Sequence, residues 1–350
     1  MSAFYKLSIK EIKRETAQAV SIVFNVPDTL KEFYQFIAGQ YVTIKLTLDG
    51  QEIRRAYSIC SSPKSGELRI AVKAIKNGFF STFANEKLAV GQVLEVGTPE
   101  GKFAFEPKAD RQRNYAAFVA GSGITPVFSI AKTVLEEEPN SSFVLVYGNK
   151  SEQETIFHEQ LHELQLQYVG RFFVQYVYSQ VNIAQALFGR IDKAAVNFVL
   201  KNKHSGLEFA KYYLCGPEEL IQTVTSVLKE NNVPDSAIKF ELFAAAASTN
   251  ESGGTGNGHT KLEIVVDGET FTIEMNQKQT LLDAALKQGI DVPYSCQGGI
   301  CSSCICKITE GTAELKKNQI LSDEELADGL TLACQAYPTS EVLKIDFDQV

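Results

Sequence analysis

The sequence predicts a multidomain protein: an antiparallel β-barrel, then an α/β domain with a parallel sheet, then a small α+β domain. The chain has 350 residues, which is too many for one ordinary core. Its hydrophobic rhythm changes near residue 110. A small, polar, glycine-rich segment at residues 244–260 divides the first 243 residues from a short tail.

Residues 1–108 contain short runs in which apolar and polar side chains alternate: "AQAVSIVFNV", "YVTIKLTL", "ELRIAVKAI" and "QVLEVGTP". A period of two is typical of strands with one buried face, and turns rich in Gly and Asp separate the runs. We therefore expect an antiparallel β-barrel in this part of the chain.

Residues 109–243 alternate apolar strands with helix patterns. "NYAAFVA" precedes "PVFSIAKTVLEEE", "SFVLVYGN" precedes "ETIFHEQLHELQLQY", and "KYYLCG" precedes "PEELIQTVTSVLKENN". This repeat predicts a Rossmann-like α/β domain, with a parallel sheet covered on both faces.

Residues 244–260, "AAAASTNESGGTGNGHT", have no apolar period and are predicted to be a flexible linker. Residues 261–350 begin with a hairpin pattern, "KLEIVVDGETFTIEM", with Asp267-Gly268 at its turn. A helix pattern follows in "TLLDAALKQG". The tail is therefore expected to be a compact α+β domain.

The net charge of −8 lies entirely in the tail. Residues 261–350 hold 15 acidic and 7 basic side chains, whereas the rest of the chain is balanced. An acidic domain argues against a nucleic-acid partner and favours a basic protein surface. Solubility alone is the alternative explanation.

No membrane partner is expected, because no apolar run approaches the roughly 20 residues of a membrane span. Lys6, Lys10 and Glu11 interrupt the start of the chain, where a secretory signal needs an apolar core. The sequence therefore predicts a cytoplasmic protein. Thiols stay reduced there, so clustered cysteines indicate metal or redox chemistry.

Four cysteines form the most specific motif. Cys296, Cys301 and Cys304 have the spacing C-x4-C-x2-C, and Cys334 lies further along the chain. This arrangement is typical of plant-type 2Fe-2S sites. A structural zinc site would more often show two C-x2-C pairs, and this chain has one. We favour the cluster over zinc or unrelated buried thiols.

Cys306 is the surplus thiol of this region, two residues beyond Cys304. Three ligands already crowd one loop, so the far side of a cluster needs a ligand from elsewhere. We expect Cys334 to be that ligand and Cys306 to be a small buried core residue.

Residues 261–350 resemble a plant-type ferredoxin domain, and the family pattern matches at all four ligand positions. This resemblance implies a β-grasp fold and a 2Fe-2S cluster.

Residues 1–108 contain Arg55-Ala56-Tyr57-Ser58. They resemble the flavin domain of the ferredoxin-NADP reductase superfamily, whose motif is R-x-Y-S/T. Tyr57 can stack on a flavin ring, Arg55 can neutralise a phosphate, and Ser58 can hydrogen-bond near the reactive ring nitrogen. "AGQY", "VKAIKNGFFSTFA" and "GTPEGKF" also resemble family segments, although Asn77 stands where paired glycines are usual. The resemblance implies FAD bound by Arg55, Ala56, Tyr57, Ser58, Val72, Lys73, Gly78, Phe79, Phe80 and Ser81.

Two strand-to-helix turns carry the nucleotide motifs. "AGSGITP" is not the G-x-G-x-x-G fingerprint, but it places glycines at a helix N-terminus, which favours phosphate. "YLCGPEE" resembles the superfamily's Cys-Gly-Pro motif beside the nicotinamide. By resemblance, the nucleotide contacts are Gly121, Ser122, Gly123, Thr125, Pro126, Cys215, Gly216 and Pro217.

The choice of nucleotide depends on the segment that begins "YGNKSE". Asn149 and Lys150 lie where relatives carry Asn-Arg, and a cation here can meet the 2′-phosphate of NADPH. Ser179 and Arg190 are further candidates. We expect NADPH, with NADH as the alternative.

"HEQLH", residues 158–162, matches the zinc motif H-E-x-x-H. It has no suitably placed third ligand nearby, and its helix must cover the sheet. We interpret the match as accidental.

Together these resemblances imply a reductase that carries electrons from NAD(P)H through FAD and the cluster to an acceptor protein. The expected catalytic residues are Ser58, Thr125, Cys215 and Glu241. The expected acceptor is an oxygenase, with a Rieske-type or steroid hydroxylase or a hybrid-cluster protein as alternatives. In a different class, the tail could be a non-redox metal-binding module on a degenerate reductase.

Overall fold

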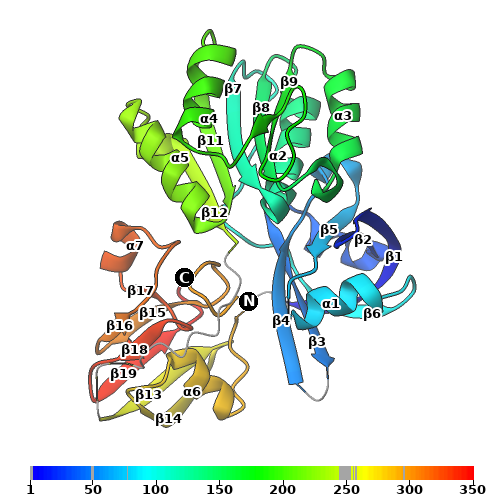
Figure 1. The fold of residues 1–350 in the computed structure, drawn as a ribbon. Coiled ribbons are helices and arrows are strands. Elements are labelled where there is room, and N and C mark those ends of the chain that lie inside the picture. The colour runs from blue at the N-terminus through cyan, green and yellow to red at the C-terminus, as the bar shows by residue number, and fades with distance from the viewer. Residues whose placement is uncertain are drawn as a thin grey trace. The chain divides into compact units, whose positions relative to one another are not determined.

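The structure is a computed structural model that describes residues 3–48, 51–76, 78–243, 254, 256, 258–294 and 296–350. The chain forms two compact units (Figure 1). One contains Phe4–Ile53 and Tyr57–Phe243, and the other contains the chain after residue 243 together with Arg54–Ala56. The predicted linker falls largely on residues 244–253, 255 and 257, which lie outside the described ranges.

The first sheet is antiparallel, with strand order β4-β3-β6-β1-β2-β5. An isolated bridge between Ile59 and Ile70 joins the chain after β4 to β5, so the two ends of the sheet approach each other as in a barrel. The elements are β1 (Phe4–Thr16), β2 (Ala19–Asn25), η1 (Asp28–Tyr34), β3 (Tyr41–Leu48), β4 (Gln51–Ser58), η2 (Pro63–Ser65), β5 (Leu68–Lys73), α1 (Phe79–Glu86) and β6 (Val93–Gly97).

The second sheet is parallel throughout, with strand order β10-β9-β8-β7-β11-β12. Its strands are β7 (Asn114–Ala120), β8 (Ser142–Asn149), β9 (Phe172–Tyr178), β10 (Leu187–Phe188), β11 (Phe209–Gly216) and β12 (Ile238–Leu242). Its helices are η3 (Gly121–Gly123), α2 (Ile124–Glu137), η4 (Glu152–Glu154), α3 (His158–Gln167), α4 (Lys193–Asn197), η5 (Phe198–Lys203), α5 (Glu218–Glu230) and η6 (Asp235–Ala237).

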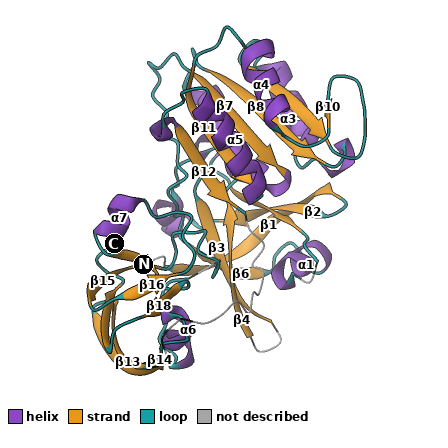
Figure 2. Ribbon diagram, turned by 60° about the vertical axis from the view of Figure 1, so that its left-hand side comes forward, coloured by secondary structure: helices purple, strands orange, loops and turns teal. Residues whose placement is uncertain are grey.

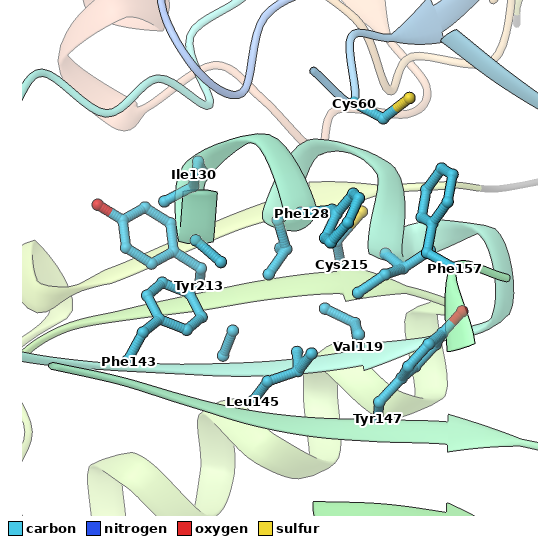
Figure 3. Packing of buried hydrophobic residues seen from close by; sticks show 14 of the residues in the cluster. Cys60, Val119, Phe128, Ile130, Phe143, Leu145, Tyr147, Phe157, Tyr213 and Cys215 are labelled. Atoms are coloured by element: carbon cyan, nitrogen blue, oxygen red, sulfur yellow. The ribbon is translucent and has the colours of Figure 1, made fainter. Parts of the chain in front are cut away.

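The antiparallel sheet and the parallel sheet both contribute to one hydrophobic core, which surrounds α2 (Figure 3). Phe128 of α2 stacks on Phe157, with ring centroids 4.6 Å apart. Ser129, also on α2, donates a hydrogen bond of 2.6 Å to the carbonyl of Ser61 in the first domain. α2 therefore fixes the barrel against the parallel sheet.

The C-terminal unit has a mixed five-stranded sheet, β14-β13-β19-β15-β17, and a separate pair, β16-β18 (Figure 2). A single cluster of buried apolar side chains fills this unit. The elements are β13 (His259–Val266), β14 (Glu269–Asn276), α6 (Leu281–Lys287), β15 (Ile305–Glu310), β16 (Ala313–Leu315), α7 (Asp323–Ala327), β17 (Leu330–Leu332), β18 (Ala336–Pro338) and β19 (Val342–Asp346).

The three predicted folds are confirmed, and local signals explain several boundaries. Asp267 and Gly268 both have positive φ, as a tight hairpin turn requires. Thr280 caps α6 by accepting a hydrogen bond from the amide of Asp283 at 3.1 Å. Within the described ranges, no helix is long and apolar enough to cross a membrane.

Glu138 organises the end of α2 and has no exposed surface. Its carboxylate accepts hydrogen bonds from the hydroxyls of Tyr115 and Ser141, both at 2.8 Å, and from the amide of Lys108 at 3.0 Å. Arg111 pairs with it at 3.4 Å. Such a satisfied buried carboxylate is costly to disturb, because its donors cannot turn to water.

We predict that Glu138→Gln lowers the free energy of unfolding by about 2–3 kcal/mol, because the new amide group would meet donors instead of acceptors. Chemical denaturation followed by circular dichroism measures this. Glu137→Gln, one residue earlier on the same helix, is the control and is expected to change stability by less than about 0.5 kcal/mol. Equal stabilities for the two variants would contradict the proposed role of Glu138.

Candidate functional site

The end of β4 lies beside the end of the parallel sheet. Ser58 donates a hydrogen bond to the carboxyl group of Glu241 on β12 at 3.2 Å. Glu241 pairs in register with Cys215 on β11. The structure thus brings together three of the four predicted catalytic residues, one from the barrel and two from the parallel sheet.

The carboxyl group of Glu241 is chemically unusual. Burial raises its pKa to about 8, although the hydrogen bond from Ser58 acts in the opposite direction. Burial, reinforced by the nearby Glu241, also raises the pKa of the Cys215 thiol. Both groups are therefore held largely protonated at neutral pH, and perturbed groups of this kind often mark functional sites.

Tyr57 lies against Phe80 of α1, with ring centroids 5.3 Å apart. Phe80 is buried, whereas Phe79 is exposed. Gly78 precedes α1, and a Cβ there would collide with the hydroxyl of Ser81. The amide of Gly78 donates a hydrogen bond to the carbonyl of Ile75 at 3.0 Å, so the turn before α1 is tight and suits a residue without a side chain.

The remaining residues predicted for the flavin have other local partners. Arg55 donates to the carbonyl of Arg54 at 2.7 Å, and Ala56 follows it on β4. Val72 is buried in the barrel core, and its carbonyl accepts a hydrogen bond from Asn85 at 3.1 Å. Asn77, where the sequence departs from the family pattern, lies outside the described residues.

The turn between β7 and α2 is compact. Gly121 has φ +56°, a conformation that favours glycine. A Cβ at Gly123 would collide with the carbonyl of Cys215, so the start of α2 can approach β11 only without a side chain. Thr125 donates a hydrogen bond to the carbonyl of Ser122 at 3.0 Å, which stabilises the first turn. Pro126 is buried within α2.

A cavity of about 580 Å³ opens at the carboxyl ends of these strands. This is where open parallel sheets bind ligands. Half of the eight predicted nucleotide contacts line it, together with the predicted phosphate partners and Lys73, which the resemblance had assigned to the flavin. The other four predicted nucleotide contacts, Gly123, Thr125, Pro126 and Cys215, are not part of the lining. The lining includes Lys73, Gly121, Ser122, Asn149, Lys150, Ser179, Arg190, Gly216 and Pro217.

Carboxylates accompany the cations at this cavity, a feature that sequence reasoning missed. Lys150 lies 3.6 Å from Glu154, and Arg190 lies 3.2 Å from Glu219. The (i, i+4) spacing of Lys150 and Glu154 is visible in the sequence, but it is common on ordinary surfaces.

The four predicted metal ligands converge in the C-terminal unit. The thiol of Cys296 contacts those of Cys301 and Cys334, and Cys334 also contacts Cys304. The amide of Gly298 donates to the sulfur of Cys296 at 3.3 Å. No group of three or more His, Cys, Asp or Glu in the described ranges is arranged to hold a single metal ion. The donor set, four thiols with a backbone amide, suits an iron-sulfur cluster.

Cys306 differs from these four. It has no exposed surface, pairs with Thr331 through β15 and β17, and belongs to the apolar core. Burial raises the pKa of its thiol. Its environment is that of a small core residue.

The H-E-x-x-H match lies on α3, in the parallel-sheet domain. His158 lies 3.9 Å from Glu152 and packs on Tyr176, with ring centroids 5.2 Å apart. His162 is exposed. Both histidines occupy ordinary positions on a surface helix.

Three family models match the chain. The oxidoreductase FAD-binding domain matches residues 6–105, the oxidoreductase NAD-binding domain matches residues 118–226, and the 2Fe-2S iron-sulfur cluster binding domain matches residues 264–339. These models support FAD, a nicotinamide nucleotide and a 2Fe-2S cluster as the cofactors.

Two full-length relatives agree with this organisation. The chain is 38% identical to a 1,2-phenylacetyl-CoA epoxidase subunit from Escherichia coli, with 99% of both chains covered. It is 34% identical to the ferredoxin reductase component of 3-ketosteroid-9-alpha-monooxygenase from Rhodococcus rhodochrous, with 97% of this chain and 96% of the relative covered.

Among solved structures, phthalate dioxygenase reductase shares the fold over 99% of this chain and 98% of its own, with a TM-score of 0.62 and 22% identity. The chain therefore belongs to the ferredoxin-NADP reductase superfamily, as an oxidoreductase with FAD-binding, NAD-binding and C-terminal 2Fe-2S domains.

Proposed function

We propose that this reductase uses NADPH to supply electrons to an oxygenase component of the phenylacetyl-CoA epoxidase type. The observation that carries the electron path is the meeting of Ser58 and Cys215 at Glu241. It brings the flavin motif of one domain beside the nucleotide motif of the next. The similarity to the epoxidase relative over the full length supports the choice of acceptor.

The cofactors divide the work by electron count: the nucleotide gives a hydride, the flavin accepts two electrons, and the cluster takes one at a time. The protein has to hold these groups and exclude water. Tyr57 offers a flat ring for stacking, and Ser58 and Glu241 offer protons beside it. The turn at Gly121–Gly123 supplies backbone amides for the nucleotide phosphates.

The thiols of Cys296, Cys301, Cys304 and Cys334 are proposed as the cluster ligands. The contacts of Cys334 with Cys296 and Cys304 support its selection over the core residue Cys306. Deprotonated thiols supply the negative charge that binds iron.

The acceptor is proposed to be a cytoplasmic oxygenase of the phenylacetyl-CoA epoxidase type. An acceptor of this type implies a role in phenylacetate degradation. A steroid hydroxylase is the second candidate, because the second relative is the reductase component of a 3-ketosteroid monooxygenase. The acidic C-terminal part favours a basic docking surface on either acceptor.

Reconstitution with each purified oxygenase component tests the acceptor. We expect NADPH oxidation coupled to product formation with the phenylacetyl-CoA epoxidase component, and at least tenfold slower coupling with the steroid monooxygenase component. The reverse order would contradict the proposed acceptor and leave the electron path intact.

We predict that Cys334→Ser abolishes the cluster but leaves the flavin, because the cluster loses the ligand that closes its far side. Cys306→Ser is the matched control and should retain both groups, because Cys306 lies in the core. Iron content, visible absorption and the electron paramagnetic resonance of reduced protein measure the outcome. A cluster that survives the first change and is lost with the second would reverse the ligand assignment.

The raised pKa of Glu241 predicts that the rate of flavin reduction depends on pH. Because its pKa is raised to about 8, the carboxyl group is neutral below that pH and becomes a buried anion above it. An anion beside the flavin opposes the arrival of a hydride. We therefore expect flavin reduction by NADPH to slow as the pH rises through about 8, and Glu241→Gln to remove this transition.

The free energy of unfolding should also depend on the ionisation of Glu241. A carboxyl whose pKa is higher in the folded state costs stability progressively as the pH rises from its ordinary value to about 8. Stopped-flow reduction and thermal unfolding across this range measure both effects, with the exposed Glu106→Gln as control. An unchanged pH profile in Glu241→Gln would rule out this carboxyl as the titrating group.

A further inference from the structure

Two lysines at the nucleotide cavity share one carboxylate. Lys73 stands at the end of β5, and Lys150 follows β8. Both line the cavity. Their ammonium groups lie 4.0 Å and 3.6 Å from the same oxygen, Oε2 of Glu154 in the short turn η4. Cations from two domains are therefore paired with a single anion.

The geometry of this carboxylate is unusual. Its Oε2 atom is buried and finds no hydrogen-bond partner within the described part of the chain. Both ammonium groups are close enough for an ion pair but too far for a normal hydrogen bond. Glu154 is therefore held by charge attraction, without the directional bonds that fix Glu138.

The other cation at this end of the cavity is paired differently. Arg190 and Glu219 form a 3.2 Å ion pair with both side chains about 80% exposed. Exposed pairs of this kind contribute little and exchange partners readily. Lys73 is more enclosed: burial and the neighbouring Lys150 lower its pKa, while Glu154 raises it. Glu154 is thus expected to affect ligand binding at this end of the cavity more strongly than Glu219 does.

We infer that Glu154 determines how strongly the cavity discriminates nucleotides with a 2′-phosphate from those without one. A 2′-phosphate bound by Lys150 needs the ammonium group that Glu154 now neutralises, and the carboxylate also repels the phosphate. Binding NADPH therefore requires Lys150 to exchange Glu154 for phosphate. NADH has no 2′-phosphate, so it can bind while Lys150 stays paired with Glu154. This role rests on the proposed function of the cavity and makes Glu154 a specificity residue within it.

Glu154 has a simpler alternative role, as a structural tie between β5 and η4. That role predicts that its removal affects all nucleotides alike, because the shape of the whole cavity would change. Specificity is a difference between two affinities, so only a pair of ligands that differ in the 2′-phosphate can separate the two roles.

The ligands 2′,5′-ADP and 5′-AMP form such a pair and carry no nicotinamide. Their dissociation constants are measured by calorimetry on the cofactor-loaded protein for the wild type, Glu154→Gln and Glu152→Gln. Glu152 is an exposed residue of the same turn that pairs with His158 at 3.9 Å, so its substitution is the matched control.

We expect Glu154→Gln to tighten 2′,5′-ADP at least about threefold more than 5′-AMP, because only the former gains an unopposed Lys150. Glu152→Gln should leave the ratio of the two constants unchanged. The double variant Glu154→Gln/Lys150→Ala should lose the gain.

An equal change for both ligands, or no change, would overturn the role of Glu154 while leaving the cavity assignment intact. Failure of the wild type to bind 5′-AMP would overturn the cavity assignment itself, and with it the role of Glu154.

Discussion

The packing of the barrel against the parallel sheet through α2 is the constraint on which the proposed site depends. The hydrogen bond from Ser129 to the carbonyl of Ser61, and the aromatic core around Phe128, set the distance between the two sheets. Only at that distance can Ser58 of one sheet reach Glu241 of the other. Neither domain alone contains the pair.

Burial has opposite chemical consequences in different parts of the chain. It keeps Glu241 and Cys215 protonated, which suits groups that must not place negative charge beside a site that receives a hydride. At Glu138, four surrounding donors compensate the carboxylate, and the result is structural. The number of donors distinguishes the two carboxyl groups: one hydroxyl reaches Glu241, whereas several groups reach Glu138.

The sequence predicted the three folds, because each has its own hydrophobic period and its own turn residues. It also predicted the glycine-rich turns that line the nucleotide cavity, since turns after parallel strands must meet at one edge of the sheet. It could not predict that one carboxylate at this cavity pairs with two lysines, because the pairing of Glu154 with Lys73 joins positions far apart in the chain. Glu138 was missed for the same reason, since its donors come from three separate segments.

The anaerobic visible absorption spectrum, recorded during separate titrations with NADPH and NADH, tests the central claim most directly. We expect a flavin band together with broad cluster absorption, both bleached by the nucleotide, with NADPH acting at the lower concentration. Flavin absorption without cluster absorption, in protein purified with its iron retained, would contradict the electron path. It would favour a non-redox role for the cysteine loop, such as zinc binding.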